Sequence, residues 1–470
     1  MTGCASVQEY IEPQDTSNGQ IVVFLKGQDK PSTDITFYLT AINIVSEDGT
    51  IKEIMKTPLK INSFELKNRQ ILLSEKLLPE GRYKKLQLMV KKASIGRKDR
   101  VADLALPPEG IEIDIDITVK RNQSTSLFLD WNADASIVDG YLFKPLFTAK
   151  GQVPELSTLL IYVTNEGSNN VSVINRQSDE VVGTIMVGKK PRGVATGLRR
   201  DRLRVYVANS GSNSISVIDP TTNKVENEIP IRFGREPEGI AVAKISPEKE
   251  FIFVTNYGSN NVSVVDALTH REIERIDVGS GPVAVAVDPY LNVYAVNKNS
   301  KDVSVIRCDI QGRCEKVINV NVEWTPMAFS VDYQRGKVYV ANYGFDKLSV
   351  IDIKTRAVSV ISDVGKYITG VTTDPTLDRI YLLREFPGEI VIIRPPSEDS
   401  STLRPIMVPV VGTIAVGNSP RSLILDPEGR KIYVVNRGSD NVSVIDKITK
   451  KEEKTIPVGK KPYGIAMFPY

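Results

Sequence analysis

The sequence predicts an all-β protein in which an N-terminal β-sandwich is followed by a seven-bladed β-propeller. Between residues 160 and 470 a Tyr-Val-x-Asn motif recurs seven times, and a second motif built on Val-Gly-x-x-Pro alternates with it. Residues 19–147 lack this repeat but alternate apolar and polar residues, which is typical of strands. We therefore expect a tether over 1–18, a sandwich over 19–147, a linker over 148–159 and a propeller over 160–470.

Each repeat indicates four short strands. The order is an inner strand such as Gly-Ile-Ala, then Tyr-Val-x-Asn, then Val-Ser-Val-Ile-Asp, then an outer run such as Thr-Ile-Met-Val. Four strands in a unit of 41 to 52 residues are typical of a propeller blade. The sixth unit departs from the pattern through an insertion over 395–409 and a replaced asparagine. The equivalent positions are Asn165, Asn209, Asn256, Asn297, Asn342, Arg384 and Asn436.

The phase of the repeat predicts how the ring closes. The first unit begins at its second strand, Leu160–Val163, and the chain ends on a first strand, Gly464–Phe468. We therefore expect the C-terminal strand to complete the first blade, because an unpaired strand would leave an open edge.

The repeat resembles the bacterial and archaeal YVTN propeller family, whose motif stands here as Tyr162-Val-Thr-Asn165. The resemblance covers nearly all of 160–470 and implies a seven-bladed propeller. It implies little about function, because one fold supports many functions. Seven-bladed propellers similar to this one include sugar lactonases and quinone-dependent dehydrogenases.

The N-terminal region predicts a β-sandwich of its own. The alternating runs are Gln20–Leu25, Ile35–Val45, Arg82–Val90, Ile111–Val119, Ser126–Asp130 and Tyr141–Phe147. The segments Leu78-Pro-Glu-Gly-Arg-Tyr83 and Leu129-Asp-Trp131 resemble a bacterial exported domain of unknown function. That resemblance implies export and says nothing about chemistry.

The three cysteines carry two predictions. Cys308 and Cys314 flank a short polar segment between two strand-like runs, so a turn there brings them within disulfide distance. Two free thiols beside a loop are the alternative. Cys4 follows small residues in Met1-Thr-Gly-Cys4, which resembles the end of a bacterial lipoprotein signal. We expect Cys4 to be the lipid attachment site, with a chance resemblance as the alternative.

Two further motifs favour structural interpretations. Asp130-Trp-Asn-Ala-Asp134 has the opening of a calcium loop but lacks the glycine at position six and the glutamate at position twelve, so we favour a polar turn. The basic stretch Arg82–Arg100 is interpreted as the solvated face of a strand and its hairpin. Contact with an acidic surface is the alternative.

The strongest candidate site is one face of the propeller, where the loops that enter the inner strands surround the axis. These loops are rich in cations and aromatic rings, which favours binding of an anion or a glycan. Loops that need charge for solubility are the alternative. The candidate ring is Lys189, Lys190, Arg192, Arg235, Trp324, Tyr367, Arg421, Lys460, Lys461 and Tyr463. Loops between second and third strands add Tyr257, Tyr343, Arg384, Phe386 and Arg437.

The composition argues against most catalytic classes. One histidine, His270, leaves most zinc sites and many acid–base mechanisms without ligands. A net charge of +3 gives no global field for nucleic acid. We therefore expect an exported, lipid-anchored binding or scaffold protein with no cofactor, no metal and no catalytic residue. Its partner would be a protein, a glycan or an anionic ligand. An enzyme of the lactonase or quinoprotein type is the alternative.

Overall fold

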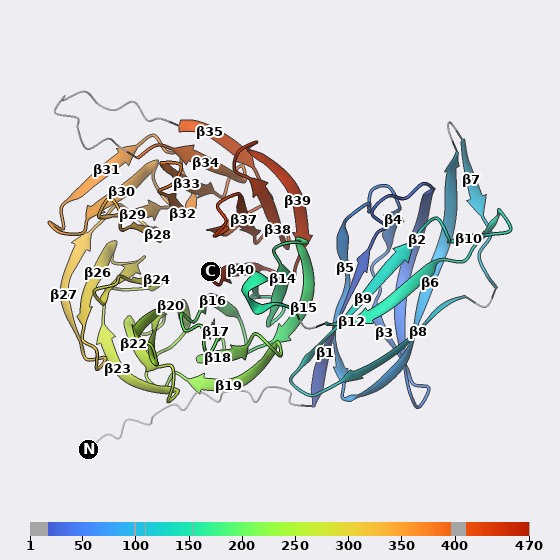
Figure 1. Cartoon of the computed structure of the whole chain (residues 1–470), viewed down its shortest axis with the longest axis horizontal. Helices are drawn as coiled ribbons and strands as arrows, with labels where there is room; N and C mark the ends of the chain where they lie inside the picture. Colours follow the sequence, from blue (N-terminus) through green and yellow to red (C-terminus); the bar gives the residue numbers. More distant parts are fainter. Residues whose placement is uncertain (1–16, 98–99, 109, 154, 396–409, 470) are drawn as a thin grey trace, which may run out of the picture.

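The structure is a computed structural model that describes residues 17–97, 100–108, 110–153, 155–395 and 410–469. It is all-β and consists of a sandwich beside a disc of radially arranged sheets (Figure 1). The described residues include no helix with the length and hydropathy needed to cross a bilayer. Cys4 and most of the insertion over 395–409 lie outside the described residues.

The sandwich has a four-stranded sheet in the order β12-β9-β1-β5 and a second sheet built on β3-β2-β6-β7, to which β4 and β8 also pair. Its strands are β1 (Asn18–Lys26), β2 (Asp34–Ser46), β3 (Ile51–Met55), β4 (Leu59–Asn62), β5 (Gln70–Pro79), β6 (Gly81–Arg97), β7 (Arg100–Leu104), β8 (Ile111–Val119), β9 (Ser124–Asn132), β10 (Ile137–Val138), β11 (Leu142–Phe143) and β12 (Leu146–Gly151). The sheet therefore continues to Gly151, into the segment that we expected to be a linker.

The sandwich core follows from alternation along its strands. In β8 every second residue, from Ile111 to Val119, is buried, and the residues between them are exposed. Trp131 lies in this core with its ring 5.1 Å from that of Phe37, and its indole N–H donates to Ser136 Oγ at 3.0 Å. A buried indole needs such an acceptor.

The propeller has seven four-stranded antiparallel sheets, as the repeat predicts. Blade 1 holds β13 (Leu160–Asn165), β14 (Asn170–Asn175), β15 (Glu180–Met186) and the C-terminal β40 (Pro462–Met467), and the 3₁₀ turn η1 (Ser157–Leu159) precedes it. Blades 2 to 4 hold β16 (Pro191–Thr196), β17 (Val205–Asn209), β18 (Ser214–Asp219), β19 (Lys224–Pro230), β20 (Pro237–Ser246), β21 (Lys249–Asn256), β22 (Asn261–Asp266), β23 (Arg271–Asp277), β24 (Pro282–Val287), β25 (Asn292–Asn297), β26 (Asp302–Cys308) and β27 (Cys314–Asn321). Blades 5 to 7 hold β28 (Pro326–Asp332), β29 (Lys337–Asn342), β30 (Lys347–Asp352), β31 (Val358–Ser362), β32 (Ile368–Asp374), β33 (Arg379–Arg384), β34 (Glu389–Ile393), β35 (Val410–Ala415), β36 (Pro420–Leu425), β37 (Lys431–Asn436), β38 (Asn441–Asp446) and β39 (Lys451–Pro457).

The two ends of the propeller join in blade 1, as the phase of the repeat predicts. β40 pairs antiparallel with β13, with Ile161 opposite Met467 and Val163 opposite Ile465. Blades 1 and 7 are also linked by an ion pair between Arg176 and Asp426 at 2.7 Å. The ring is therefore closed without a covalent bond.

Inner strands approach each other closely at one glycine position. A Cβ atom on Gly193 would lie 2.4 Å from the carbonyl oxygen of Glu238, and one on Gly464 would lie 2.4 Å from that of Arg192. Real Cβ atoms do not approach backbone so closely, so glycine at this position lets neighbouring blades pack around the axis.

The repeated asparagine closes the second turn in six of the seven blades. In blade 3, Asn256 Nδ2 donates to Asn261 Oδ1 at 2.7 Å and to Ser263 Oγ at 2.8 Å. In the sixth blade Arg384 occupies this position and pairs with Glu389 instead. Both outer strands of that blade form, although its sequence is the least regular.

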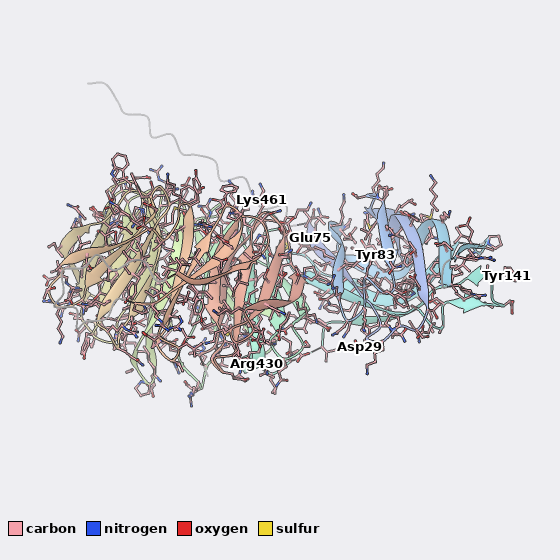
Figure 2. The ribbon with its side chains drawn as sticks, turned by 90° about the horizontal axis from the view of Figure 1, so that it is seen from above. Asp29, Glu75, Tyr83, Tyr141, Arg430 and Lys461 are labelled. Carbon is pink, nitrogen blue, oxygen red and sulfur yellow. A yellow bond between two sulfur atoms is a disulfide. The ribbon has the colours of Figure 1, made fainter. Side chains whose placement is uncertain are left out.

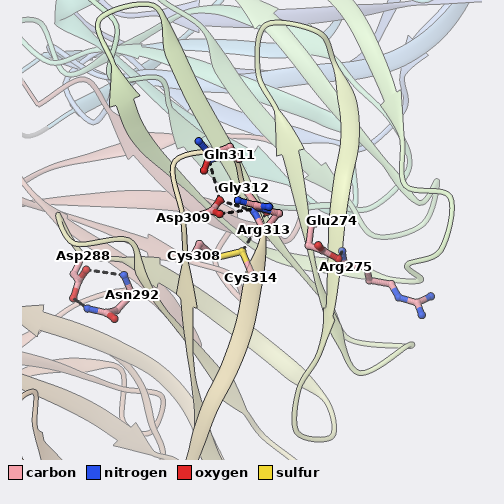
Figure 3. Close-up of a disulfide and its surroundings, with 10 residues drawn as sticks. All are labelled: Glu274, Arg275, Asp288, Asn292, Cys308, Asp309, Gln311, Gly312, Arg313 and Cys314. Atoms are coloured by element: carbon pink, nitrogen blue, oxygen red, sulfur yellow. Dashed lines mark hydrogen bonds and ion pairs between the residues drawn. A yellow bond between two sulfur atoms is a disulfide. The ribbon is translucent and has the colours of Figure 1, made fainter.

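The predicted disulfide is confirmed. Cys308 ends β26 and Cys314 begins β27, with their Cα atoms 4.1 Å apart (Figure 3). Asp309 holds the turn between them by accepting the backbone N–H groups of Gln311 and Arg313. Closing so short a loop removes little entropy from the unfolded chain. The chain-entropy relation puts the resulting stabilisation of the folded state at about 2 kcal/mol.

The sandwich covers the outer strand of blade 1. The Gln70 amide donates to the carbonyl of Val181 at 3.1 Å and accepts its N–H at 3.0 Å. Ser126 Oγ accepts the N–H of Thr184 at 2.9 Å. Val22 and Phe24, on the face of β1 opposite the sandwich core, pack in one apolar cluster with blades 1 and 7. These contacts satisfy a sheet edge that would otherwise be open.

Glu75 makes this contact dependent on pH. It accepts hydrogen bonds from Ser168 and Asn170 of blade 1. Burial raises the pKa of the Glu75 carboxyl above its ordinary value of 4.5, and these hydrogen bonds oppose the effect only in part. The native state therefore binds the proton more tightly than the unfolded state does, so the free energy of unfolding falls as the pH rises above about 4.5.

We predict that Glu75→Gln removes this part of the pH dependence, because the amide stays neutral and keeps an acceptor oxygen. Urea unfolding between pH 4.5 and 7.5 should show a smaller loss of stability in the variant than in the wild type. Glu112→Gln is the matched control, because the hydrogen bond from Lys85 lowers the pKa of that exposed carboxyl. Equal pH slopes for wild type and Glu75→Gln would contradict the prediction.

Candidate functional site

Two sets of loops meet at one face of the propeller, which we call the top face. The first residue of each inner strand pairs with the last residue of the second strand, as Pro191 does with Asn209. The loops before the inner strands and the loops after the second strands therefore lie at the same end of the axis. Figure 2 shows Lys461 on this face and Arg430 on the opposite one.

A pocket of about 500 Å³ opens on the top face at the axis. Its inner ring takes one residue from each blade, the second residue of the inner strand. These residues are Arg192, Glu238, Val283, Met327, Thr369, Arg421 and Tyr463. Its outer ring uses the residue after the second strand, and the members that line the pocket are Tyr257, Lys298, Tyr343, Glu385 and Arg437.

One wall of the pocket is a stack of two guanidinium groups on a tyrosine. The guanidinium carbons of Arg192 and Arg421 lie 5.4 and 4.6 Å from the centre of the Tyr463 ring. The buried Glu238 carboxylate accepts from Arg192 at 2.9 Å and from the Tyr463 hydroxyl, and it lies 3.6 Å from Arg421. Each charge in this wall therefore has a partner.

These contacts fix the protonation states of the wall. Burial, with a further contribution from Glu238, raises the pKa of Tyr463 to about 12 although the two arginines oppose it. Burial lowers the pKa of Arg192, but the Glu238 carboxylate and its other partners outweigh burial, and the pKa rises. Tyr463 is therefore neutral and Arg192 charged at neutral pH.

A second carboxylate continues the network away from the axis. Glu166 pairs with Arg192 at 3.1 Å and with Arg437 at 2.8 Å. Burial raises the pKa of Glu166, but Arg437 and Arg192 together lower it below its ordinary value. The cations on this side of the pocket are thus neutralised by carboxylates of the same wall.

On the opposite side of the pocket Tyr343 belongs to the lining, and further aromatic rings lie outside the lining beside it. The Tyr343 hydroxyl donates to Glu385 at 2.7 Å, and burial together with this bond raises the pKa of Tyr343 to about 12. The Tyr367 ring lies 5.5 Å from that of Tyr343 and 5.7 Å from that of Phe386. The Lys301 ammonium lies 3.0 Å from the centre of the Trp324 ring.

Only some residues of the predicted ring line the pocket. Arg192, Arg421 and Tyr463 line the pocket, and Trp324 and Tyr367 are exposed on its aromatic side. The remaining cations lie on the entering loops outside the pocket lining, at Lys189, Lys190, Arg235, Lys460 and Lys461.

The expected excess of positive charge does not extend into the pocket. Its cations face Glu236, Glu238 and Glu385, and Glu166 holds two of the arginines. Sequence reasoning missed Glu166, Lys298 and Glu385. Their place in the repeat could have identified them, because each directly follows the residue that ends a second strand, a position that is asparagine in most blades.

The other sequence motifs have structural partners. Asp134 accepts the backbone N–H groups of Ser32 and Thr33, and Asp130 pairs with Lys150, so the two carboxylates do not converge. Acidic residues of β8 neutralise part of the basic stretch, as Asp116 does for Arg82. Among the described residues, no three His, Cys, Asp or Glu side chains gather closely enough to hold a metal ion.

Comparisons with known proteins agree with the two-part architecture. No curated protein sequence matches the chain. Residues 20–145 match the family described as Domain of unknown function (DUF4382).

Solved structures match over about two thirds of the chain. Kuenenia stuttgartiensis hydrazine synthase is 21% identical, with 62% of this chain and 93% of that chain covered and a TM-score of 0.53. A functionally unknown protein from Desulfotomaculum acetoxidans is 13% identical, with 66% and 99% covered and a TM-score of 0.56. A protein from Lactobacillus plantarum is 12% identical, with 65% and 98% covered and a TM-score of 0.54. At these identities the likeness concerns the fold alone. The chain is thus an all-β protein with a β-propeller and an N-terminal region that matches the DUF4382 model.

Proposed function

We propose that the protein is a non-enzymatic binding protein that holds a carbohydrate in the pocket of its top face. One observation carries the proposal: the pocket combines tyrosine rings with arginine and glutamate side chains that already neutralise one another. Ligand pockets of 300–1,000 Å³ with a few fixed polar groups are typical binding sites. The volume of about 500 Å³ lies within this range.

The charge balance favours a glycan over a simple anion. Arg192 is held by Glu238 and Glu166, so an anionic ligand would have to compete with two carboxylates. The same paired groups retain N–H donors and lone pairs in fixed positions, which suits a ligand with many hydroxyl groups. Because neighbouring side chains already hold these groups, little conformational entropy is lost on binding.

We further propose that the protein is exported and anchored through lipid on Cys4. The Cys308–Cys314 disulfide supports an oxidising compartment. The resemblance of residues 78–83 to a bacterial exported domain is consistent with this proposal.

A carbohydrate array followed by calorimetry on the intact chain tests the proposed function. We predict that Tyr463→Phe weakens binding of the selected sugar about tenfold, because the ligand site loses a hydroxyl that Glu238 orients. Glu238→Gln should weaken it by a similar or larger factor, because Arg192 and Arg421 lose their shared carboxylate. Thermal unfolding of each variant shows that it is folded.

Tyr290→Phe is the matched control, because Tyr290 is 84% exposed in the turn between β24 and β25, on the opposite face. Its affinity should equal that of the wild type. An array with no carbohydrate bound, or pocket variants that bind as well as Tyr290→Phe, would overturn the proposed function.

A further inference from the structure

The pocket is only the centre of a larger surface. On one side lies an aromatic arc, which we define as Trp324, Phe345, Tyr367 and Phe386. Their side chains are 56%, 40%, 43% and 59% exposed. Exposed apolar groups that form a continuous patch mark interaction sites in soluble proteins.

The aromatic arc is continuous with the pocket wall. The N–H of Tyr343 donates to the carbonyl of Thr325 at 3.0 Å, and the N–H of Tyr367 donates to that of Tyr343 at 2.9 Å. The N–H of Glu385, beside Phe386, donates to the carbonyl of Tyr367 at 2.9 Å. Loops of blades 4 to 6 are thus joined edge to edge, which holds the rings in a row that begins at the pocket.

A lysine arc lies on the other side of the pocket, and we define it as Lys189, Lys190, Lys460 and Lys461. It comes from two copies of one sequence, Val-Gly-Lys-Lys-Pro, at 187–191 and 458–462. Both copies are bonded to the same loop of blade 1. The N–H of Lys190 donates to Asn169 Oδ1 at 2.8 Å, and the N–H of Gly167 donates to the carbonyl of Lys460 at 2.9 Å.

The four ammonium groups differ from the cations inside the pocket. None of them lies within 4.0 Å of a carboxylate among the residues that the structure describes, and Lys460 acts on one at longer range, the Glu75 carboxyl. Lys190 and Lys461 are exposed, and each directly precedes the proline of an inner strand whose next residue lines the pocket. The lysine arc is therefore charge available to a ligand that extends past the pocket edge.

The two arcs lie across the axis from each other. The aromatic arc belongs to the loops that border β28–β33, and the lysine arc belongs to the loops that precede β16 and β40 (Figure 1). A ligand confined to the pocket would leave both arcs unused. A chain that passes through the pocket would reach both.

We propose that the ligand is an extended acidic polysaccharide whose sugar rings stack on the aromatic arc and whose acid groups face the lysine arc. This inference rests on the proposed function of the pocket. Aromatic faces contact the apolar faces of sugars, and separated ammonium groups attract carboxylates or sulfates along a chain. A single-stranded nucleic acid also needs rings and cations. Oligo(dT) is therefore a competing probe in the test below, because the pocket carboxylates Glu236, Glu238 and Glu385 face any polyanion that passes through it.

Oligosaccharide series on the intact chain test the inference. The probes are oligogalacturonates of two, four and eight units, neutral malto-oligosaccharides of the same lengths, and an eight-residue oligo(dT), each titrated by calorimetry at low and high salt. For the acidic series we expect affinity to rise at least tenfold from dimer to octamer, because the longer chain adds stacking and ionic contacts. Raising the salt from about 50 to 300 mM should weaken octamer binding severalfold, since exposed charges are screened.

Two variants separate the arcs. Trp324→Ala with Phe386→Ala should make the gain in affinity from dimer to octamer roughly tenfold smaller and leave dimer affinity unchanged, because two ring contacts outside the pocket are lost. Lys190→Ser with Lys461→Ser should abolish most of the salt dependence. Tyr290→Ala and Lys451→Ser are matched controls, because both side chains are exposed and distant from the top face. They should behave as wild type.

The outcomes are distinguishable. If dimers bind but affinity does not grow with length, the pocket function stands and the extended ligand is wrong. If neutral and acidic octamers bind equally, the acidic class is wrong. If oligo(dT) binds more tightly than the acidic octamer, the surface is a nucleic-acid site and the inference is overturned. If no saccharide of any length binds, the proposed function itself fails.

Discussion

Deletion of residues 462–470 is expected to destroy the folded propeller. The deletion removes β40, the inner strand of blade 1, and leaves β13 with an open edge at the axis. It also removes the buried side chains of Ile465, Met467 and Phe468. Burial of three such side chains contributes about 5–9 kcal/mol. That is comparable to the whole stability of a typical domain, so the truncated chain should lose its cooperative thermal transition and aggregate.

Circular dichroism and size-exclusion chromatography measure this loss. Met467→Leu is the control, because a volume-conserving change in the same strand should cost less than about 1.5 kcal/mol. Addition of a synthetic peptide of residues 462–470 should restore part of the folded signal, since closure is non-covalent. A truncated chain that melts at the wild-type temperature would contradict closure through β40.

Lys447→Ala is expected to destabilise the propeller by about 3–5 kcal/mol, the cost of leaving a buried charge without its partner. Lys447, in the turn between β38 and β39, forms an ion pair with Asp374 at the end of β32, and the two side chains are only 3% and 4% exposed. The pair links blade 7 to blade 6. Urea unfolding of the variant should show a lower midpoint with an unchanged slope.

The paired replacement Lys447→Met with Asp374→Asn should recover most of this loss, because no uncompensated charge remains. The introduced amide would keep an oxygen for the backbone N–H groups of Thr376 and Leu377, which Asp374 accepts in the wild type. Lys150→Ala, which breaks the exposed pair with Asp130, should cost less than about 1 kcal/mol. If Lys447→Ala costs no more than Lys150→Ala, the buried pair does not stabilise the ring.

The propeller could be predicted from the sequence because each blade repeats one local pattern. The Tyr-Val-x-Asn run is a strand that ends in a fixed turn, so its seven copies indicated seven sheets and its phase indicated closure through β40. The sandwich was predicted less completely. β1 reads as a continuous apolar run because Ile21 and Val23 face the sandwich core while Val22 and Phe24 face the propeller. Periodicity alone cannot say what covers a second apolar face.

The candidate site was predicted by region and not by residue. Lys190 and Arg192 are two positions apart, yet Arg192 lines the pocket and Lys190 does not. Lys190 has a positive φ of 51°, as its equivalents Glu236 and Lys461 also do, and this left-handed residue redirects the chain just before the inner strand. The amino-acid composition of a loop does not distinguish such neighbours. The prediction from the sequence therefore overestimated the positive charge at the axis.

The pocket draws one inner-ring side chain from each blade at the same repeat position, and this has an evolutionary consequence. Such a position can mutate without disturbing the blade that carries it, because the blade is held by its own apolar layers and asparagine turn. Ligand preference in this architecture can therefore change one side chain at a time at uncharged ring positions such as Val283 and Met327. Arg192, Glu238 and Tyr463 hold one another, so lineages with this fold should exchange those three together, and should differ least at the turn asparagines.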